Sequence, residues 1–331
     1  MIASALDFPG SAPQDYPPLE KEPLFDPGRH LALARPDGRL DLSDLGYDAA
    51  TIAACPTSLA ITAPFRVLSD EGVACLQEVA TLLECFTTSN PRISRNVRGG
   101  VYRSRFLRDL CCAPDVTAFM AELAGMPLAP HSMPHQLGHL NYQPHRIGEH
   151  VDKWHVDTLR IDYVLFVTDP TEIDGGAFEF FRGTRDEVAA LTAAETPLPE
   201  DRIVAPAMPG PGHAVLMQGN MVVHRGRGLQ RPGRRITMVN GYVPTDLTLE
   251  DYCRYDQLCL ADPEHVVTAE YERHVAWRAR ERAQQILSRP GFGDPREESA
   301  RRLEAMAHEL TAAAQAIRSA ESARIEHFGD G

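Results

Sequence analysis

Apolar residues recur at the spacing of an α-helix in three separate parts of the chain. The first stripe follows Ser69, which can cap a helix, and consists of Val73, Leu76, Val79, Leu82 and Leu83. The second ends before Gly125 and consists of Val116, Phe119, Met120 and Leu123. The third follows Asp294 as N-cap and Pro295 as first helical residue, and consists of Leu303, Met306, Leu310, Ala314 and Ile317. The pattern therefore predicts helices over residues 69–86 and 115–124 and after Asp294.

Between about residues 136 and 243 the pattern changes to short apolar runs rich in β-forming residues. Glycine, proline and aspartate separate these runs, which read QLGHLNY, HVDKWHVD, RIDYVLFVT, AFEFF, HAVLM, MVVH and RITMVNGYV. Many short strands at this spacing are typical of an antiparallel sandwich or jelly roll. The predicted fold class is therefore mainly β with flanking helices: a jelly-roll core, N-terminal helices and a C-terminal helical segment.

The same pattern divides the chain into three parts. Residues 1–30 contain six prolines, too many for a regular element, and are expected to form an extended arm or a mobile leader. Residues 31–262 are expected to form a single catalytic domain around the core at about 136–243. Residues 263–331 are expected to form an amphipathic helical extension that packs on the core or uses the same stripe at a homodimer interface.

Composition and charge exclude several classes of partner. The chain has 331 residues with 33 Lys+Arg against 46 Asp+Glu, a formal charge of −13, which argues against binding to nucleic acid or anionic lipid. No apolar run approaches the roughly 20 residues that span a bilayer, and the acidic, proline-rich start does not resemble a signal peptide. Seven cysteines without CxxC spacing fit reduced thiols, so we expect a cytoplasmic protein.

One histidine–aspartate pair and a later histidine suggest a metal site. On a strand, residues i and i+2 point to the same face, so His155 and Asp157 can both face one metal ion. His224, at the end of the apolar run MVV, can supply a third ligand from a neighbouring strand. Two histidines and one carboxylate leave open positions on the ion, as in non-haem Fe(II) oxygenases.

The tripeptide His-x-Asp is too short to identify this site alone. It occurs twice, as His150-Val151-Asp152 and as His155-Val156-Asp157. We favour His155 and Asp157, because Trp154 precedes them and a long apolar strand follows. His150 and Asp152 remain the alternative pair.

A nearby arginine suggests the chemistry of a co-substrate. Arg235 and Thr237 face the same side of a predicted strand that begins eleven residues after His224. An arginine inside an apolar barrel needs an anionic partner, and its planar fork suits a carboxylate, with the Thr237 hydroxyl as another donor. A dicarboxylic acid that reaches from the metal to Arg235 would explain both features.

Together these features resemble the 2-oxoglutarate- and Fe(II)-dependent dioxygenases, in the broad branch of phytanoyl-CoA hydroxylase-like and prolyl hydroxylase-like enzymes. The resemblance spans roughly residues 139–243, about a third of the chain, and depends on the order and spacing of short motifs. These are Trp154-His155-x-Asp157, IDYVLFVTDP, Asp174-Gly175-Gly176-Ala177-Phe178, Phe181-Arg182-Gly183-Thr184, Pro211-Gly212-His213, His224 and Arg235-x-Thr237.

The resemblance implies a cupin-like double-stranded β-helix in which His155, Asp157 and His224 bind Fe(II). It further implies that Arg235 and Thr237 bind the distal carboxylate of 2-oxoglutarate, which is converted with O2 to succinate and CO2. Tyr142, on the strand before the metal motif, resembles a tyrosine or asparagine position that often touches this co-substrate. The presence of Asp157 argues against halogenating members of the superfamily, which lack the carboxylate.

The expected substrate is a small polar metabolite, such as an amino acid or a related natural-product intermediate, that is hydroxylated or otherwise oxidised at a C–H bond. Three arginines near the expected mouth are candidate substrate ligands, namely Arg160, Arg182 and Arg225. An alternative is a cupin-type metal-dependent isomerase or hydrolase, which would not need Arg235 beside Thr237. A non-catalytic scaffold ranks last, because all three metal ligands and the arginine are present.

Overall fold

A nine-stranded antiparallel sheet lies at the centre of the computed structural model, which describes residues 4–289, 293–319 and 325–329. Its main order is β1 (Arg39–Asp41), β2 (Leu59–Thr62), β11 (His213–Met217), β8 (Ile161–Phe166), β13 (Ile236–Pro244), β6 (His139–Tyr142) and β4 (Asn96–Val97). Two short strands complete it: β3 (Phe65–Arg66) pairs with β11 and β5 (Leu128–Pro130) with β13. The predicted β-rich segment supplies β6, β8, β11 and β13.

A smaller antiparallel sheet comes entirely from the segment between Asp152 and Gly226. Its strands are β10 (Ile203–Val204), β9 (Phe178–Phe181), β12 (His224–Gly226) and β7 (Asp152–His155), in that order. In the register of this sheet, His224 of β12 lies opposite His155 of β7 and Phe180 of β9. Two residues far apart in sequence therefore become neighbours.

Alternation along the strands gives the larger sheet two different faces. On one face, Val164, Phe166 and Val215 pack with Phe178 and Phe180 of the smaller sheet. On the other face, the intervening residues, such as Tyr163 and Leu165, join the apolar side chains of the N-terminal helices. Because successive side chains of a strand point to opposite faces, each buried strand contributes to both cores. The prediction of antiparallel sheets with flanking helices is confirmed.

Three helices cover the outer face of the larger sheet: α3 (Asp70–Leu83), α5 (Arg105–Cys111) and α6 (Pro114–Ala124). The backbone N–H of Gly72 donates to the hydroxyl of Ser69 at 3.0 Å, which caps α3. Gly125 ends α6 in a left-handed conformation with φ of 69°, which glycine adopts without a steric penalty. Both helices predicted in this part of the chain are confirmed.

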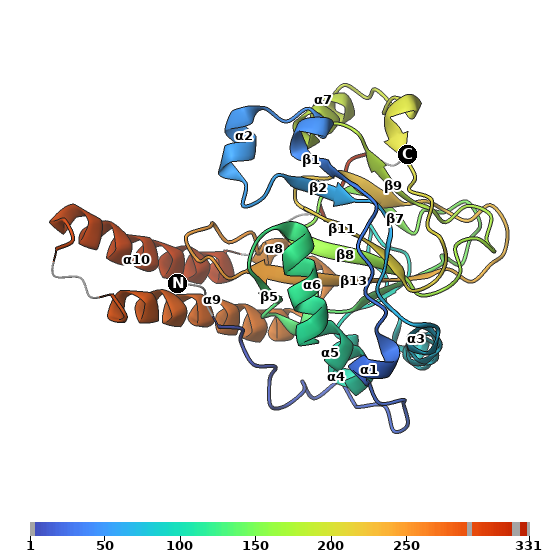
Figure 1. Ribbon diagram of the computed structural model, residues 1–331, viewed down its shortest axis with the longest axis horizontal. Coiled ribbons are helices and arrows are strands. Elements are labelled where there is room, and N and C mark those ends of the chain that lie inside the picture. Colours follow the sequence, from blue (N-terminus) through green and yellow to red (C-terminus); the bar gives the residue numbers. More distant parts are fainter. Residues whose placement is uncertain (1–3, 290–292, 320–324, 330–331) are drawn as a thin grey trace.

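The other short elements lie around the two sheets (Figure 1). The helices are α1 (Pro27–His30), α2 (Ala49–Ala54), α4 (Gly100–Arg103) and α7 (Arg185–Ala193). The 3-10 turns are η1 (Leu42–Leu45), η2 (Glu84–Phe86), η3 (Pro134–Gln136) and η4 (Glu200–Arg202).

The described C-terminal residues form α8 (Tyr255–Ala261), α9 (Glu264–Leu287) and α10 (Arg296–Arg318). Figure 1 shows α9 and α10 side by side, extending away from the sheets. The predicted helix after Asp294 begins at Arg296, and its N-cap is Pro295 rather than Asp294. The carboxylate of Asp294 instead forms a salt bridge with Arg302 at 2.7 Å. No helix among the described residues is long and apolar enough to cross a membrane.

Part of the apolar stripe predicted for α10 lies outside the core. Leu303 and Leu310 are 61% and 44% exposed, respectively. Ala313, Ala316 and Ile317 instead pack with the cluster around α8 and α9. Of the stripe predicted from helical spacing, Ile317 packs with this cluster, and Met306 lines a pocket with Arg282 and Ile286 of α9.

The described residues before α1 form no helix or strand, and they lie against helices from distant parts of the chain. The backbone N–H of Leu19 donates to the carbonyl of Arg103 at 2.8 Å, and the Trp277 indole donates to the carbonyl of Ser4 at 2.8 Å. The arm thus contacts both the N-terminal helices and α9.

Candidate metal centre

The end of β7 and the beginning of β12 bring the three predicted metal ligands together. His155 is the last residue of β7 and His224 the first of β12. Asp157 follows β7, held by a hydrogen bond from its backbone N–H to the carbonyl of Gly219 at 2.9 Å. Each of the three offers a ligand atom within 4.8 Å of the others, one of two such groups among the described residues.

Both imidazoles present the same ring nitrogen to Asp157. His155 Nε2 lies 3.4 Å from Asp157 Oδ1, and His224 Nε2 lies 3.4 Å from Asp157 Oδ2. The opposite nitrogens bond to backbone carbonyls, His155 Nδ1 to Lys153 at 2.6 Å and His224 Nδ1 to Val222 at 3.0 Å. Because a carbonyl oxygen can only accept a hydrogen bond, each ring carries a proton on Nδ1, and a neutral ring directs the lone pair of Nε2 inward.

The electrostatic environment sets the protonation of His224 and Asp157. Burial, together with the neighbouring His155, lowers the pKa of His224 to about 4, so the ring is neutral at physiological pH. Burial opposes ionisation of Asp157, but His224 and His155 hold the pKa of that carboxyl well below its usual range. A neutral imidazole at His224 and an ionised carboxylate at Asp157 are the protonation states that a divalent metal requires.

The donor set fits a non-haem iron ion. Asp157 Oδ2 is buried and has no hydrogen-bond partner, which is costly for a carboxylate oxygen unless a cation binds there. Two nitrogens and one oxygen from one side of the site leave the remaining positions of a six-coordinate ion open. The residues present therefore fit Fe(II).

Buried neutral histidines make the metal-free protein sensitive to acid. Burial lowers the pKa of His131 to about 3, of His224 to about 4 and of His139 well below its ordinary value. Unfolding restores values of about 6.5, so the unfolded chain binds more protons below that pH and stability falls. Burial and the neighbouring Asp157 raise the pKa of Asp162, so the folded protein holds a proton there. This proton opposes the effect of one of the three histidines on stability.

We therefore expect the free energy of unfolding of chelator-treated protein to fall between pH ~6.5 and pH ~5. Urea titrations at the two pH values measure this difference. Equal stability at both would contradict the neutral, buried state of these histidines.

Arg235 and Thr237 lie beside the metal group. Arg235 is 2% exposed, and its Nη1 donates to Thr237 Oγ1 at 2.9 Å while its Nε donates to the carbonyl of Gly176 at 2.9 Å. Both residues line a cavity that His155, Asp157 and His224 also line. The predicted juxtaposition of metal ligands, arginine and threonine is therefore present in one cavity.

No carboxylate within the described ranges forms a salt bridge with Arg235. Burial lowers the pKa of Arg235 to about 10, so the group still carries its charge at neutral pH. The charge of Asp152 stabilises this guanidinium from beyond salt-bridge distance, but a buried guanidinium without a directly bonded carboxylate remains unfavourable by several kcal/mol. The cavity is thus complementary to an anion that contacts Arg235.

The prediction for Tyr142 is wrong. Its side chain joins the outer core of the larger sheet and donates to the carbonyl of Ala80 at 2.7 Å. Asn141 lines the cavity instead, opposite Thr237 in the register of β6 and β13, and its Oδ1 is buried without a hydrogen-bond partner. Neighbouring residues of a strand face opposite sides, so a shift of one position exchanges the two roles.

Of the three candidate substrate arginines, only Arg225 lines this cavity. Its Nε donates to Glu179 Oε2 at 2.8 Å, and its guanidinium lies 4.5 Å from the centre of the Trp154 ring. Arg160 instead donates to the carbonyl of Glu250 outside the cavity. Arg182 is exposed and points to the carbonyl of Asp44, so Arg160 and Arg182 do not belong to this site.

The alternative pair, His150 and Asp152, forms no metal-binding group among the described residues. His150 belongs to neither metal-binding group among the described residues. Asp152 pairs with Arg92 at 3.0 Å and lies 3.5 Å from His155 Nδ1, behind the ring. Arg92, which sequence reasoning missed, lines the cavity; no sequence motif marks it, because it precedes β4 in an irregular segment.

No protein-family model matches the sequence, and no curated protein matches it. Solved structures similar to the chain include SnoN, a non-haem α-ketoglutarate-dependent epimerase from nogalamycin biosynthesis, at 17% identity over 62% of this chain and 88% of that one, with a TM-score of 0.41. EctD from S. alaskensis with bound Fe is 17% identical over 72% and 89%, with a TM-score of 0.40.

HygX from Streptomyces hygroscopicus, with nickel, 2-oxoglutarate and hygromycin B bound, is 14% identical over 60% of this chain and 86% of that one, with a TM-score of 0.39. With TM-scores of 0.39 to 0.41, these likenesses assign no reaction to this chain, and any assignment rests on the residues of the site.

Proposed function

We propose that this protein is a 2-oxoglutarate- and Fe(II)-dependent oxygenase with a double-stranded β-helix core formed by the two facing sheets. The observation that supports this most strongly is the single cavity that contains a two-histidine, one-carboxylate group and a buried arginine without a salt-bridge partner among the described residues. A metal site alone would also suit an isomerase or hydrolase. The arginine adds a requirement for an anionic co-substrate.

Each residue has a defined role in this proposal. His155, Asp157 and His224 hold Fe(II), and Arg235 and Thr237 bind the distal carboxylate of 2-oxoglutarate. Bound iron would supply the oxidation, in which one atom of O2 enters succinate as CO2 is lost and the other enters the substrate.

The protein itself positions the reactants and excludes water. Phe178, Val164 and Val239 form apolar walls of the cavity, where charge interactions are stronger than in water. The unpartnered Asn141 amide oxygen faces the same space and can accept a hydrogen bond from a bound molecule. The two carbonyl-bound imidazoles keep their orientation without a metal, so the site is formed in advance.

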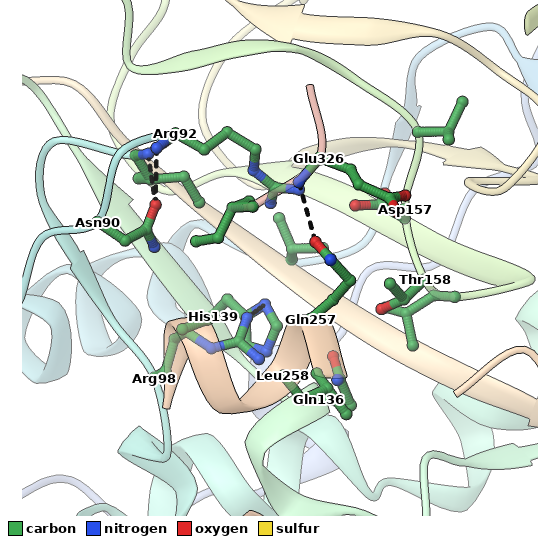
Figure 2. A pocket seen from close by; sticks show the side chains of 16 residues that line it. Asn90, Arg92, Arg98, Gln136, His139, Asp157, Thr158, Gln257, Leu258 and Glu326 are labelled. Atoms are coloured by element: carbon green, nitrogen blue, oxygen red, sulfur yellow. Dashed lines mark hydrogen bonds between the residues drawn. The ribbon is translucent and has the colours of Figure 1, made fainter. Parts of the chain in front are cut away.

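A second cavity supports a small polar substrate. It shares Arg92, His139 and Asp157 with the first, so a molecule in it can approach the metal group. Figure 2 shows that its walls also carry polar side chains from distant segments, including Asn90, Gln136, Thr158, Gln257 and Glu326.

This polar lining suits a small polar molecule such as an amino acid, as the sequence suggested. The segment around Ile325 and Glu326 forms part of the wall, and the backbone N–H of Glu326 donates to Gln257 at 2.9 Å. We assign residues 31–262 to catalysis, with the C-terminal extension contributing this wall, and place the reaction in the cytoplasm, where the seven free cysteines remain reduced.

The direct test is turnover of 2-oxoglutarate by purified protein. With added Fe(II) and air, succinate should accumulate even without the prime substrate, and a panel of amino acids should accelerate it if one of them binds. Absence of succinate with Fe(II), across the panel, would instead favour a metal-dependent isomerase or hydrolase.

A further inference from the structure

A second group of ligand-type side chains lies away from the proposed iron site. Asp251 and Cys253 belong to the segment between β13 and α8, and His274 lies on α9. Their ligand atoms lie within 4.8 Å of one another, and none of the three lines the cavity that contains His224. We propose that this group binds Zn(II) in addition to the iron.

Hydrogen bonds orient His274 for this role. Its Nε2 lies 2.8 Å from Asp251 Oδ2, and its Nδ1 lies within hydrogen-bond distance of Ser132 Oγ. When Nδ1–H donates to the serine oxygen, the lone pair of Nε2 points toward Asp251. The cation then takes the place of the proton that Nε2 and the carboxylate share in the metal-free protein.

The sulfur of Cys253 faces a hydrogen-bond donor. The backbone N–H of Met133 donates to His131 Nδ1 at 3.1 Å, so a neutral His131 ring carries its proton on Nε2. That Nε2 lies 3.5 Å from Cys253 Sγ. His131 thus donates to the sulfur, as the partners of metal-bound thiolates do, and supports the ligand without binding the ion itself.

Charge balance favours a divalent ion. One thiolate and one carboxylate neutralise two positive charges, so the complex is neutral in a mostly buried place where His274 is 0% and Asp251 20% exposed. The nearby Arg278 does not compete for Asp251, because its Nε pairs with Glu309 and its Nη2 donates to the carbonyl of Leu249.

The ligand types separate this site from the first. Thiolate with imidazole selects zinc over magnesium or calcium, whereas the first group contains no sulfur. Asp251 and Cys253 also line a small cavity with Arg160, which leaves room for a water molecule as fourth ligand. The ion would connect the segment after β13 to α9 and so fix that helix to the larger sheet.

Cobalt(II) distinguishes the two sites, because only a cysteine ligand gives a thiolate-to-cobalt charge-transfer band in the near ultraviolet. We expect this band when cobalt is added to chelator-treated, reduced wild-type protein, with an excess of zinc over both metal groups abolishing it. Cys253→Ser should lose the band. Cys259→Ser, a matched control in the adjacent α8, should keep it.

Thermal unfolding gives an independent readout. In variants that lack the first metal group, zinc should raise the melting temperature of His224→Ala and of His224→Ala/Cys259→Ser, and leave that of His224→Ala/Cys253→Ser unchanged. His224→Ala should retain the band, which separates this proposal from the proposed oxygenase activity. Absence of the band in the folded wild type, or its survival in Cys253→Ser, would overturn the zinc site.

Discussion

Replacing His224 with alanine is expected to abolish iron binding and, with it, all conversion of 2-oxoglutarate to succinate. The substitution removes one of three protein ligands and leaves Asp157 Oδ2 without the imidazole 3.4 Å away. Loss of a group that merely orients a ligand costs about 10- to 100-fold in metal affinity, so loss of the ligand itself should cost at least about 100-fold. Metal analysis after gel filtration and a succinate assay measure the two effects.

His150→Ala is the matched control for this variant. His150 belongs to the competing His-x-Asp tripeptide but to neither metal-binding group of the described residues. Its replacement should leave iron content and succinate formation close to those of the wild type. If His150→Ala lost iron while His224→Ala kept it, the ligand assignment would be wrong.

Arg235→Met should raise the KM for 2-oxoglutarate by about 30-fold or more while iron binding remains. The substitution keeps an apolar chain of similar length and removes the cation that faces the cavity. Breaking a buried, hydrogen-bonded charge pair costs about 2–5 kcal/mol, which corresponds to this range of affinity. Because Arg235 has no carboxylate partner among the described residues, the free protein should not lose stability. Steady-state kinetics and thermal unfolding test both statements.

Two further substitutions separate charge from shape. Arg235→Lys keeps the charge but not the planar fork, and should give an intermediate KM. Arg182→Met removes an exposed arginine outside the cavity and should have no effect. An unchanged KM in Arg235→Met would contradict the proposed co-substrate site and favour a metal enzyme that does not use 2-oxoglutarate.

Local patterns in the sequence predicted the elements that depend on local physics. Ser69 and Gly125 mark helix ends because a side-chain cap and a left-handed residue act within a few positions. His155 and Asp157 could be paired because strand geometry relates residues two apart. Arg235 and Thr237 share a face for the same reason, and their hydrogen bond at 2.9 Å agrees with it.

Features that depend on tertiary packing were not accessible in this way. Tyr142 and Asn141 differ by one position, and only the pairing of β6 with β13 determines which faces the cavity. Leu303 and Leu310 satisfy helical spacing but are exposed. The sequence of α10 alone does not show which of its turns pack against other helices.

The second metal group lies still further from any local pattern. Its members come from an irregular segment and from the middle of α9, at positions 251, 253 and 274. The arrangement depends on the packing of α9 against that segment and against residues 131–133. Short-range motifs therefore could not predict it.

Anaerobic binding of 2-oxoglutarate tests the central claim most directly, because it requires the metal group and Arg235 to act on one molecule. Isothermal titration of the wild type should show about one equivalent of 2-oxoglutarate bound when Fe(II) is present, and much weaker binding after chelation. His224→Ala and Arg235→Met should each lose the tight binding. Equal affinity with and without metal, or no binding by iron-loaded wild type, would contradict a single cavity that holds both.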